Sequence, residues 1–308
     1  MNAYSITGST PFVNSLFCIK YAIYDDEEKN FDDLNLRFID KSEKQHLYEN
    51  IDTLPLSFVL RDDFLNKYNY DSANPATVQN NFARAMDLNP MLEKINIEIE
   101  DRKAKFSIPE NGDYYLFVRD KSIDEISVDF STTTKTYKNI DRGYFVELGY
   151  LKQGENIEVR NDYNSNELLI EVFRFNFENL KKVNKKILDD SKFSINYFTD
   201  TNISYNIESE IDGSCFLSLI YDDSFDIFVD NEKIEKKKIF DCFLGFDIKK
   251  GKHKINIKFF PKGLYLGMFF SIIGILLFLI LICFNKHKLK MSSLLYECFL
   301  NKKKQRRI

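Results

Sequence analysis

Adjacent aspartates are the commonest arrangement in this sequence that could do chemistry. Five such pairs occur, at positions 25–26, 32–33, 62–63, 189–190 and 222–223. Glycoside chemistry needs two carboxyl groups roughly 5 to 10 Å apart across a cleft, whereas neighbours on a strand point to opposite faces. Most of these pairs are therefore expected to be solvated turn residues. Asp222 and Asp223 differ because they follow Tyr221 and precede Ser224 and Phe225 in a turn between two apolar segments.

We treat Tyr221, Asp222, Asp223 and Phe225 as a candidate glycan-facing turn. The two carboxylates could bind a sugar or a Ca²⁺ ion. Ordinary turn chemistry is the alternative, since aspartate stabilises turns through bonds to nearby backbone. Both interpretations stay open at the level of the sequence.

The remaining residues argue against a catalytic centre in this chain. The sequence contains no Gly-rich phosphate loop, no HExxH zinc motif and no GxSxG nucleophile elbow. Its three histidines are His46, His253 and His287, and each is expected to be solvated rather than a base or a ligand. We therefore predict no catalytic residue, no metal ion and no cofactor.

The five cysteines do not form a metal motif. No CxxC pair occurs, and no histidine lies near a cysteine at ligand spacing. Cys215 and Cys242 lie in one β-rich segment and form a candidate disulfide outside the cell. The alternative is that both are buried free thiols.

The elements that must position these residues are mostly strands. From Lys105 onward apolar residues alternate with polar ones, a period of two that is typical of half-buried strands. Turns such as Asn111-Gly112 separate these segments, and regular short strands with such turns favour a β-sandwich or jelly-roll. Strands are expected at 113–118, 126–130, 144–148, 156–159, 168–173, 203–207, 215–221, 225–229, 240–246 and 254–260.

Helices are expected at two places between the strands. Asn74 and Pro75 supply an N-cap and a first-turn proline, so a helix is predicted from residue 76 to about 94. The spacing of Phe177, Leu180 and Val183 predicts a second, connecting helix. An apolar stretch at 12–24 is expected to be β-rich, and 54–60 is expected to be a short strand.

The expected fold is mainly β: two β-sandwich or jelly-roll-like modules with short connecting helices, plus one C-terminal transmembrane helix. An N-terminal α+β segment is expected at 1–98 and a β-sandwich module at 99–175. A connector helix at 176–192 leads to a second β module at 193–262. A transmembrane helix at 263–285 and a basic tail at 286–308 complete the chain.

The apolar run at 264–284 contains no charged residue. About 20 such residues match the hydrocarbon thickness of a bilayer, whereas a buried core helix is rarely uncharged for so long. Gly263, Gly267 and Ser271 recur every four residues, which would let a neighbouring helix approach closely on this helix-packing face. A lipid-facing helix with incidental small residues is the alternative.

Charge is distributed unevenly around this run. Eight basic residues and one acid follow it, which leaves 35 of the 43 basic and 46 of the 47 acidic residues before it. The positive-inside rule then predicts a single pass through the cell membrane, with the bulk extracytoplasmic and the C-terminus cytoplasmic. The acidic bulk also argues against nucleic acid as a partner. Residues 1–10 lack the basic and apolar regions of a signal peptide, so we expect the chain to be the end of a longer polytopic protein.

Several segments resemble the YfhO family of bacterial membrane proteins, in the order in which that family has them. The stretch at 218–234 is similar to the pattern I-P-Y-D-x-G-W-x-V-x-V-D-G-x-x-V, and the stretch at 243–267 to the region that follows it. The patterns N-S-L-x-G-V-K-Y, L-Y-E-N…L-P-x-x-F and N-P-F-x-x-Q-N have counterparts at 14–21, 47–58 and 74–80.

This resemblance implies a polytopic glycosyltransferase of the GT-C type that uses lipid-linked sugars to decorate cell-envelope polymers such as teichoic acids. In such enzymes the catalytic carboxylate lies in an early extracytoplasmic loop, so no catalytic residue is carried over to this chain. The chain corresponds to the last extracytoplasmic domain and the last membrane helix. The family's Gly-Trp pair is Ser224-Phe225 here, and Phe225 would replace the tryptophan only weakly as a platform for a sugar.

Two functions are consistent with the sequence. The first is the non-catalytic C-terminal portion of a YfhO-like protein that glycosylates a cell-envelope polymer, beside other transmembrane helices of a polytopic partner or a missing N-terminal portion. The second is a free-standing, membrane-anchored surface module that binds glycans or protein partners. In both, the expected partners include the lipid bilayer and a cell-envelope glycopolymer.

Overall fold

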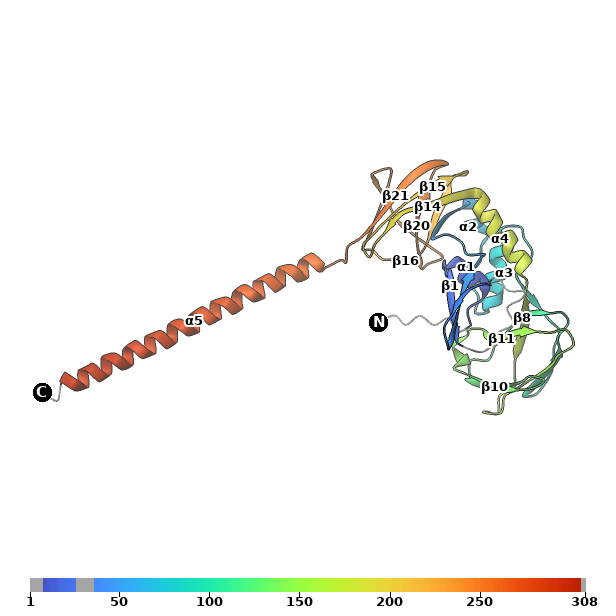
Figure 1. The fold of residues 1–308 in the computed structure, drawn as a ribbon, viewed down its shortest axis with the longest axis horizontal. Helices are drawn as coiled ribbons and strands as arrows, with labels where there is room; N and C mark the ends of the chain where they lie inside the picture. The colour runs from blue at the N-terminus through green and yellow to red at the C-terminus, as the bar shows by residue number, and fades with distance from the viewer. Residues whose placement is uncertain (1–7, 26–35, 306–308) are drawn as a thin grey trace. The chain divides into compact units, whose positions relative to one another are not determined.

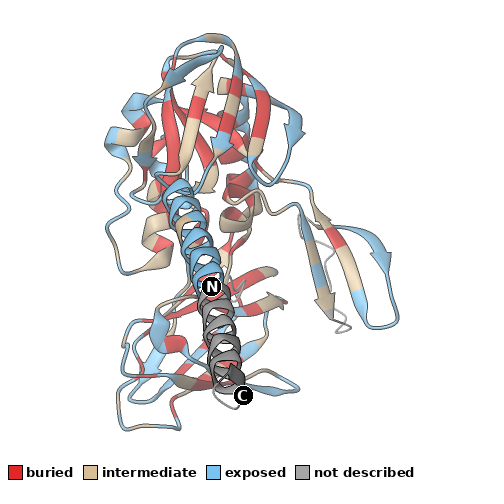
Figure 2. Cartoon of the chain, turned by 90° about the vertical axis from the view of Figure 1, so that its left-hand side faces the viewer, coloured by how far each residue is buried: buried red, intermediate tan, exposed pale blue. Residues whose placement is uncertain are grey.

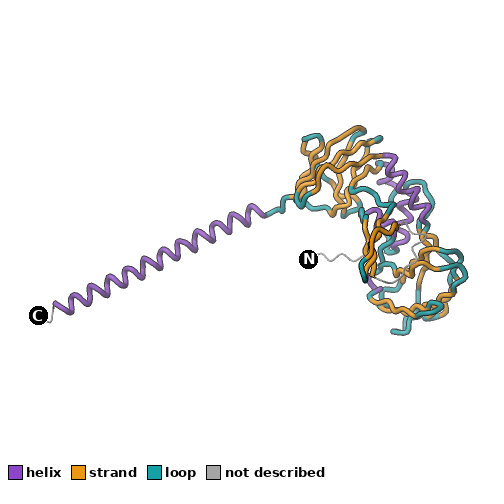
Figure 3. The backbone as a smooth tube through the Cα atoms, viewed as in Figure 1, coloured by secondary structure: helices purple, strands orange, loops and turns teal. Residues whose placement is uncertain are grey.

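The computed structural model describes residues 8–25 and 36–305. Strands dominate the described chain, as Figure 3 shows, so the mainly β prediction is confirmed. The chain divides into two compact units. The first comprises Met1–Asp222 with Ile227–Ile257, and the second comprises Asp223–Asp226 with Lys258–Ile308.

The first β module is a sandwich of two antiparallel sheets. Its strands are β5 (Leu92–Lys94), β6 (Glu98–Glu100), β7 (Lys103–Ser107), β8 (Gly112–Val118), β9 (Glu125–Asp129), β10 (Thr134–Lys138), β11 (Val146–Leu151), β12 (Asn156–Arg160) and β13 (Ile170–Phe175), with a 3₁₀ turn at Ile140–Arg142. The sheet orders are β10-β9-β12-β7-β6 and β11-β8-β13-β5. Val128 and Val159 of the first sheet share one buried cluster with Leu116 and Val172 of the second, which confirms the predicted sandwich.

Strand β8 is buried on both faces, so its sheet is a middle layer. Tyr114 and Leu116 belong to the sandwich core, whereas Tyr115 and Phe117 belong to the cluster around the helices. Alternate residues of a strand point to opposite faces, so a strand that is buried along its length must be covered on both sides. Figure 2 shows the buried residues along the strands of the modules.

The second β module combines strands from distant parts of the chain. They are β4 (Ser57–Leu60), β14 (Ser191–Phe198), β15 (Asn202–Ser209), β16 (Gly213–Ile220), β17 (Phe225–Val229), β18 (Glu232–Ile234), β19 (Lys237–Ile239), β20 (Phe243–Ile248) and β21 (Gly251–Phe259). The sheet orders are β14-β15-β21-β17-β18 and β19-β20-β16-β4. The antiparallel register of β16 with β4 pairs Leu217 with Ser57. The segment at 1–98 thus supplies one strand to the module at 193–262, and the strand predicted at 54–60 is confirmed.

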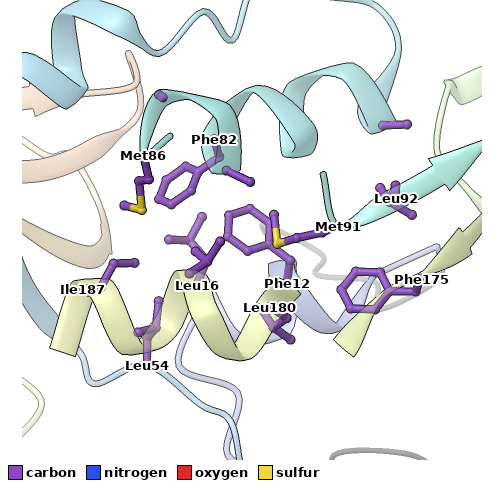
Figure 4. Close-up of a cluster of buried hydrophobic side chains, with 14 of the residues drawn as sticks. Phe12, Leu16, Leu54, Phe82, Met86, Met91, Leu92, Phe175, Leu180 and Ile187 are labelled. Carbon is purple, nitrogen blue, oxygen red and sulfur yellow. The ribbon is translucent and has the colours of Figure 1, made fainter. Parts of the chain in front are cut away.

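Four α-helices pack against residues from both modules (Figure 1): α1 (Pro11–Leu16), α2 (Asp62–Lys67), α3 (Pro75–Ala85) and α4 (Phe177–Asp190). In Figure 4, Phe82 of α3 faces Leu180 of α4 across a buried cluster. Phe175 from the first module and Phe216 from the second belong to the same cluster. A continuous apolar core therefore joins the modules through the helices. A three-stranded sheet of β1 (Tyr21–Asp25), β3 (Gln45–Asn50) and β2 (Leu36–Lys41), in that order, completes the first unit.

The start of α3 follows its sequence signal, but its end does not. The Asn74 side chain accepts a hydrogen bond from the backbone N–H of Ala76, and Pro75 opens the helix, as predicted. The helix ends at Ala85 instead of continuing to about residue 94. Asp87 has a left-handed backbone (φ 57°), and Pro90 disfavours helical geometry in the residue before it. The residues that follow form β5 instead.

The prediction of a β-rich stretch at 12–24 is wrong for its first half. Pro11–Leu16 is helix α1, and only β1 is strand. Thr10 caps α1 by accepting a hydrogen bond from the Val13 N–H, and Pro11 lies in its first turn. The cap-and-proline signal that marks α3 was thus also present here. The predicted connecting helix is confirmed as α4, which Asn176 caps.

The C-terminal helix α5 (Leu264–Gln305) contains the membrane span. Its first part, Leu264–Phe284, is the one helix in residues 8–25 and 36–305 that is long and apolar enough to cross a membrane. Its 21 residues extend about 32 Å at a rise of 1.5 Å each, close to the ~30 Å of a bilayer's hydrocarbon core. None of its most apolar window is buried inside the chain, unlike a core helix of a globular domain.

Candidate functional site

The candidate turn lies between β16 and β17, as predicted. Tyr221 is half-buried, and Asp222 and Asp223 are exposed. Tyr221 and Asp222 belong to the first unit, whereas Asp223–Asp226 belongs to the second unit together with the membrane helix. The structure therefore divides the predicted site residues between two sets of contacts.

Hydrogen bonds join the second half of the turn to the segment that leads into α5. The backbone N–H of Phe260 donates to the carbonyl oxygen of Ser224 at 3.0 Å. The N–H of Lys262 donates to Ser224 Oγ, also at 3.0 Å. Asp223 Oδ2 and Lys262 Nζ form an ion pair at 3.1 Å. Exposed ion pairs stabilise only weakly, so the two bonds to Ser224, which extend the pairing of β17 with β21, hold this connection more firmly than the ion pair does.

Aromatic rings pack beside these hydrogen bonds. The rings of Phe225 and Phe259 lie 4.9 Å apart between centroids. Phe260 and Tyr265 are stacked at 4.5 Å with an interplanar angle of 24°. Phe225, a site residue predicted from the sequence, thus packs against Phe259 at the end of β21, five residues before α5 begins.

Tyr221 has a different set of partners. Its backbone N–H donates to the carbonyl oxygen of Cys242 at 2.7 Å. The ammonium groups of Lys238 and Lys236 lie 5.2 Å and 6.0 Å from the centroid of its ring, within the range of cation–π attraction. A sugar that stacks on this face of the ring would have to displace these lysine side chains.

The carboxylates of the turn are not gathered for metal binding. In the part of the chain that the structure describes, no group of three or more His, Cys, Asp or Glu side chains converges on a potential metal position. Asp223 is engaged with Lys262 instead. This arrangement suits turn and ion-pair chemistry, and the glycan-binding role of the turn stays a prediction.

The two cysteines of the candidate disulfide are free thiols in the structure. Cys215 is buried, and its Sγ lies 3.0 Å from Ser57 Oγ and 3.7 Å from the Tyr205 hydroxyl. Burial raises the pKa of the Cys215 thiol to about 11. Cys242 is exposed in the turn just before β20, and its pKa is raised by partial desolvation and by the nearby Asp241 carboxylate. The alternative of two buried thiols therefore applies to Cys215 only.

Of the predicted helix-packing face Gly263, Gly267 and Ser271, only the last two residues lie on α5. Gly263 precedes α5 and has a left-handed backbone (φ 87°), and its carbonyl oxygen accepts the N–H of Gly267 at 2.8 Å. It therefore caps the helix and does not belong to the helical stripe. Gly267 and Ser271 are exposed on α5, and Gly274 continues their face three residues later. Contact of this face with another helix stays a prediction.

His253 has a structural role that its sequence context concealed. Its Nδ1 lies 2.7 Å from Asp230 Oδ2, and its Nε2 lies 3.1 Å from the carbonyl oxygen of Lys249. The N–H of Lys254 and the His253 ring lower the pKa of Asp230. The residue predicted to be solvated thus fixes the turn between β20 and β21.

These features define a class of protein: a mainly β body followed, within the described residues, by a helix that is long and apolar enough to cross a membrane. The family described as bacterial membrane protein YfhO matches residues 92–271, which is more than half of the chain. The chain therefore belongs to the YfhO family, and the resemblance seen in its sequence is confirmed. No curated protein matches the chain.

Solved structures are only distantly similar. A cupin 2 conserved barrel domain protein from Leptotrichia buccalis is 14% identical, with a TM-score of 0.15. The match covers 55% of this chain and 88% of the cupin chain, and the coverages below are given in the same order. A GH2 beta-galacturonidase from Eisenbergiella tayi is 11% identical and covers 79% and 37%, with a TM-score of 0.17. A quercetin 2,3-dioxygenase from Acinetobacter baumannii is 7% identical and covers 56% and 79%, with a TM-score of 0.15. Scores this low support no statement about function.

Proposed function

We propose that this chain is the C-terminal extracytoplasmic domain and last membrane helix of a YfhO-like membrane protein that takes part in glycosylating a cell-envelope polymer of the teichoic-acid type. One observation carries this proposal. The family match extends from residue 92, at the start of β5 in the first module, to residue 271, inside the candidate membrane span. In this function the chain is non-catalytic by itself and acts on the acceptor side of the reaction.

The contacts of the candidate site support a binding role rather than a chemical step. Tyr221 supplies an aromatic ring on which a sugar could stack by displacing the side chains of Lys236 and Lys238, and Asp222 adds an exposed carboxylate. A ring and hydrogen-bonding groups of this kind suit a carbohydrate. The small residues Gly267, Ser271 and Gly274 provide a close-approach face for a helix of a polytopic partner.

Polymer composition tests the proposed function. We expect deletion of the chain in its native cell to reduce the glycosyl substituents of an envelope polymer, and re-expression to restore them. Tyr221→Ala combined with Asp222→Asn should restore them only partly, because the binding turn is lost. Tyr163→Ala, at an exposed site of the first module (47% exposed), is the matched control. Compositional analysis of the purified polymer is the measurement, and an unchanged polymer after deletion would contradict the proposal.

A free-standing surface module that binds glycans or protein partners is the second candidate. It is favoured by the continuous apolar core of the first unit, in which both modules and four helices take part. Affinity purification of the tagged chain in mild detergent separates the two functions. Recovery of a polytopic membrane protein with the native chain, but not with the Gly267→Leu variant, would support the first function. Glycan retention by the chain without any such partner would support the second.

Native cysteines report the proposed orientation. In intact cells, a membrane-impermeant maleimide should label Cys242, and should label Cys298 only after permeabilisation. Buried Cys215 should react only after denaturation, which provides an internal control. Because its raised pKa lowers the thiolate fraction of Cys242 at neutral pH, its labelling rate should rise as the pH is increased above neutral. Mass spectrometry of the digested protein gives the result, and labelling of Cys298 but not Cys242 in intact cells would reverse the orientation.

A further inference from the structure

Where the membrane span starts determines how deep in the bilayer the residues just before it lie. The span begins at Leu264, and the residues ahead of it enter the head-group layer, which is roughly 5 to 7 Å thick on each side of the hydrocarbon core. Phe260 and Lys262 lie four and two residues before the span. They must therefore lie at or near the head groups whenever the span crosses a bilayer.

The turn at 223–226 is held at the same depth by direct contacts. Ser224 accepts hydrogen bonds from the N–H groups of both Phe260 and Lys262, and Asp223 pairs with Lys262. Hydrogen bonds of 3.0 Å leave no room for these two segments to separate in depth. All these contacts lie within the second compact unit, which also contains the span.

The side chains of this region suit a lipid head-group layer. The stacked rings of Phe260 and Tyr265 are 41% and 72% exposed, and aromatic side chains with a polar end are favoured at membrane interfaces. Lys262 is also exposed, with 68% of its side chain accessible. Its long apolar stem and charged end suit an interface, where such a stem contacts hydrocarbon while the ammonium stays among phosphates.

We propose that Asp223–Asp226 and residues 258–265 form one lipid-facing platform, which rests in the head-group layer at the end of the span that begins at Leu264. The occupant of this surface is the lipid itself, because the platform is continuous with the membrane span. This inference depends on the span and not on the proposed glycosylation. It extends that function in one respect: a glycan bound at Asp223 would have to lie at the membrane surface.

The absence of tryptophan from the sequence allows a clean test. The full chain carrying Phe225→Trp is reconstituted in phosphatidylcholine vesicles, with or without a lipid whose head group carries a nitroxide quencher. We expect the quencher to cause a large loss of tryptophan emission. Ile275→Trp, near the middle of the span Leu264–Phe284 and in the same compact unit, is the control and should lose less to a head-group quencher. Equal losses at the two positions, or no loss at Phe225→Trp, would overturn the proposal.

A second tryptophan variant controls for a local folding defect at position 225. Phe260→Trp lies on the other segment of the platform and is expected to be quenched like Phe225→Trp. Circular dichroism checks that each variant retains its strands. If Phe260→Trp is quenched while a folded Phe225→Trp is not, the turn does not share the depth of the span's start, and the proposal fails.

Discussion

Asn80→Leu is expected to lower the free energy of unfolding by about 3 kcal/mol or more, since each buried polar group left without a partner costs about 1–3 kcal/mol. Asn80 is 6% exposed on α3. Its Oδ1 accepts the N–H groups of Met91 at 3.0 Å and Leu92 at 2.8 Å, and its Nδ2 donates to the carbonyl oxygen of Leu92 at 2.8 Å. Leucine has a similar size but makes none of these bonds, so three backbone groups would lose their partner.

Denaturant unfolding of the detergent-solubilised protein, followed by circular dichroism, measures this effect. Asn81→Leu is the matched control on the same helix. The Asn81 side chain donates to the carbonyl oxygen of Asn69 and accepts from Arg84 at a partly exposed position, so its replacement should cost less than about 1 kcal/mol. Similar midpoint shifts for the two variants would show that the Asn80 bonds do not hold β5 against α3.

Phe216→Ala is the second variant with a large expected effect. Phe216 is fully buried, and its ring lies 4.8 Å from Phe58, 5.0 Å from Phe243 and 5.9 Å from Phe240 between centroids. Truncating a buried phenylalanine typically costs about 3–5 kcal/mol, through lost transfer energy and the cavity left behind. The loss should fall on the sheet that β4 completes, because Phe58 belongs to that strand.

Two further variants serve as controls for Phe216→Ala. Phe216→Leu keeps an apolar side chain and should recover part of the lost stability. Phe198→Ala removes a ring that is 59% exposed at the end of β14 and should change stability by no more than about 0.5 kcal/mol. The unfolding midpoint is again the measurement. Equal midpoints for Phe216→Ala and Phe198→Ala would mean that the aromatic cluster does not stabilise the module.

Local signals in the sequence predicted much of this fold. The charge-free run predicted the membrane helix, the alternation of apolar and polar residues predicted the sandwich strands, and Asn74 with Pro75 predicted the start of α3. The end of α3 was placed too late: Pro90 is a helix-ending signal that the prediction to about residue 94 passed over. The exact end at Ala85 also depends on the left-handed backbone of Asp87, which an aspartate does not require. The pairing of β4 with β16 was missed because nothing in the four residues Ser57–Leu60 specifies a partner so distant in the chain.

The candidate site shows the same division between local and distant contacts. The turn at 221–225 and the small residues of α5 could be predicted because each is a local pattern. That Asp223–Asp226 shares a compact unit with α5 could not be predicted, since it depends on hydrogen bonds that Ser224 accepts from the N–H groups of Phe260 and Lys262, more than 30 residues away in the chain. The role of Gly263 as a cap was hidden because its four-residue spacing to Gly267 is also the spacing of a helical stripe.

The pairing of β4 with β16 also sets the order in which this protein can fold during synthesis. Ser57 and Leu217 are partners in the register, so β4 leaves the ribosome long before its neighbour exists. At about 5–20 residues per second, the delay is roughly 8 to 30 s. Throughout that time one edge of β4 presents unpaired backbone groups, which favour association with other chains. Complete folding of the second module must therefore wait until nearly the whole body of the protein has been made, and a chaperone that shields the N-terminal segment would act during this interval.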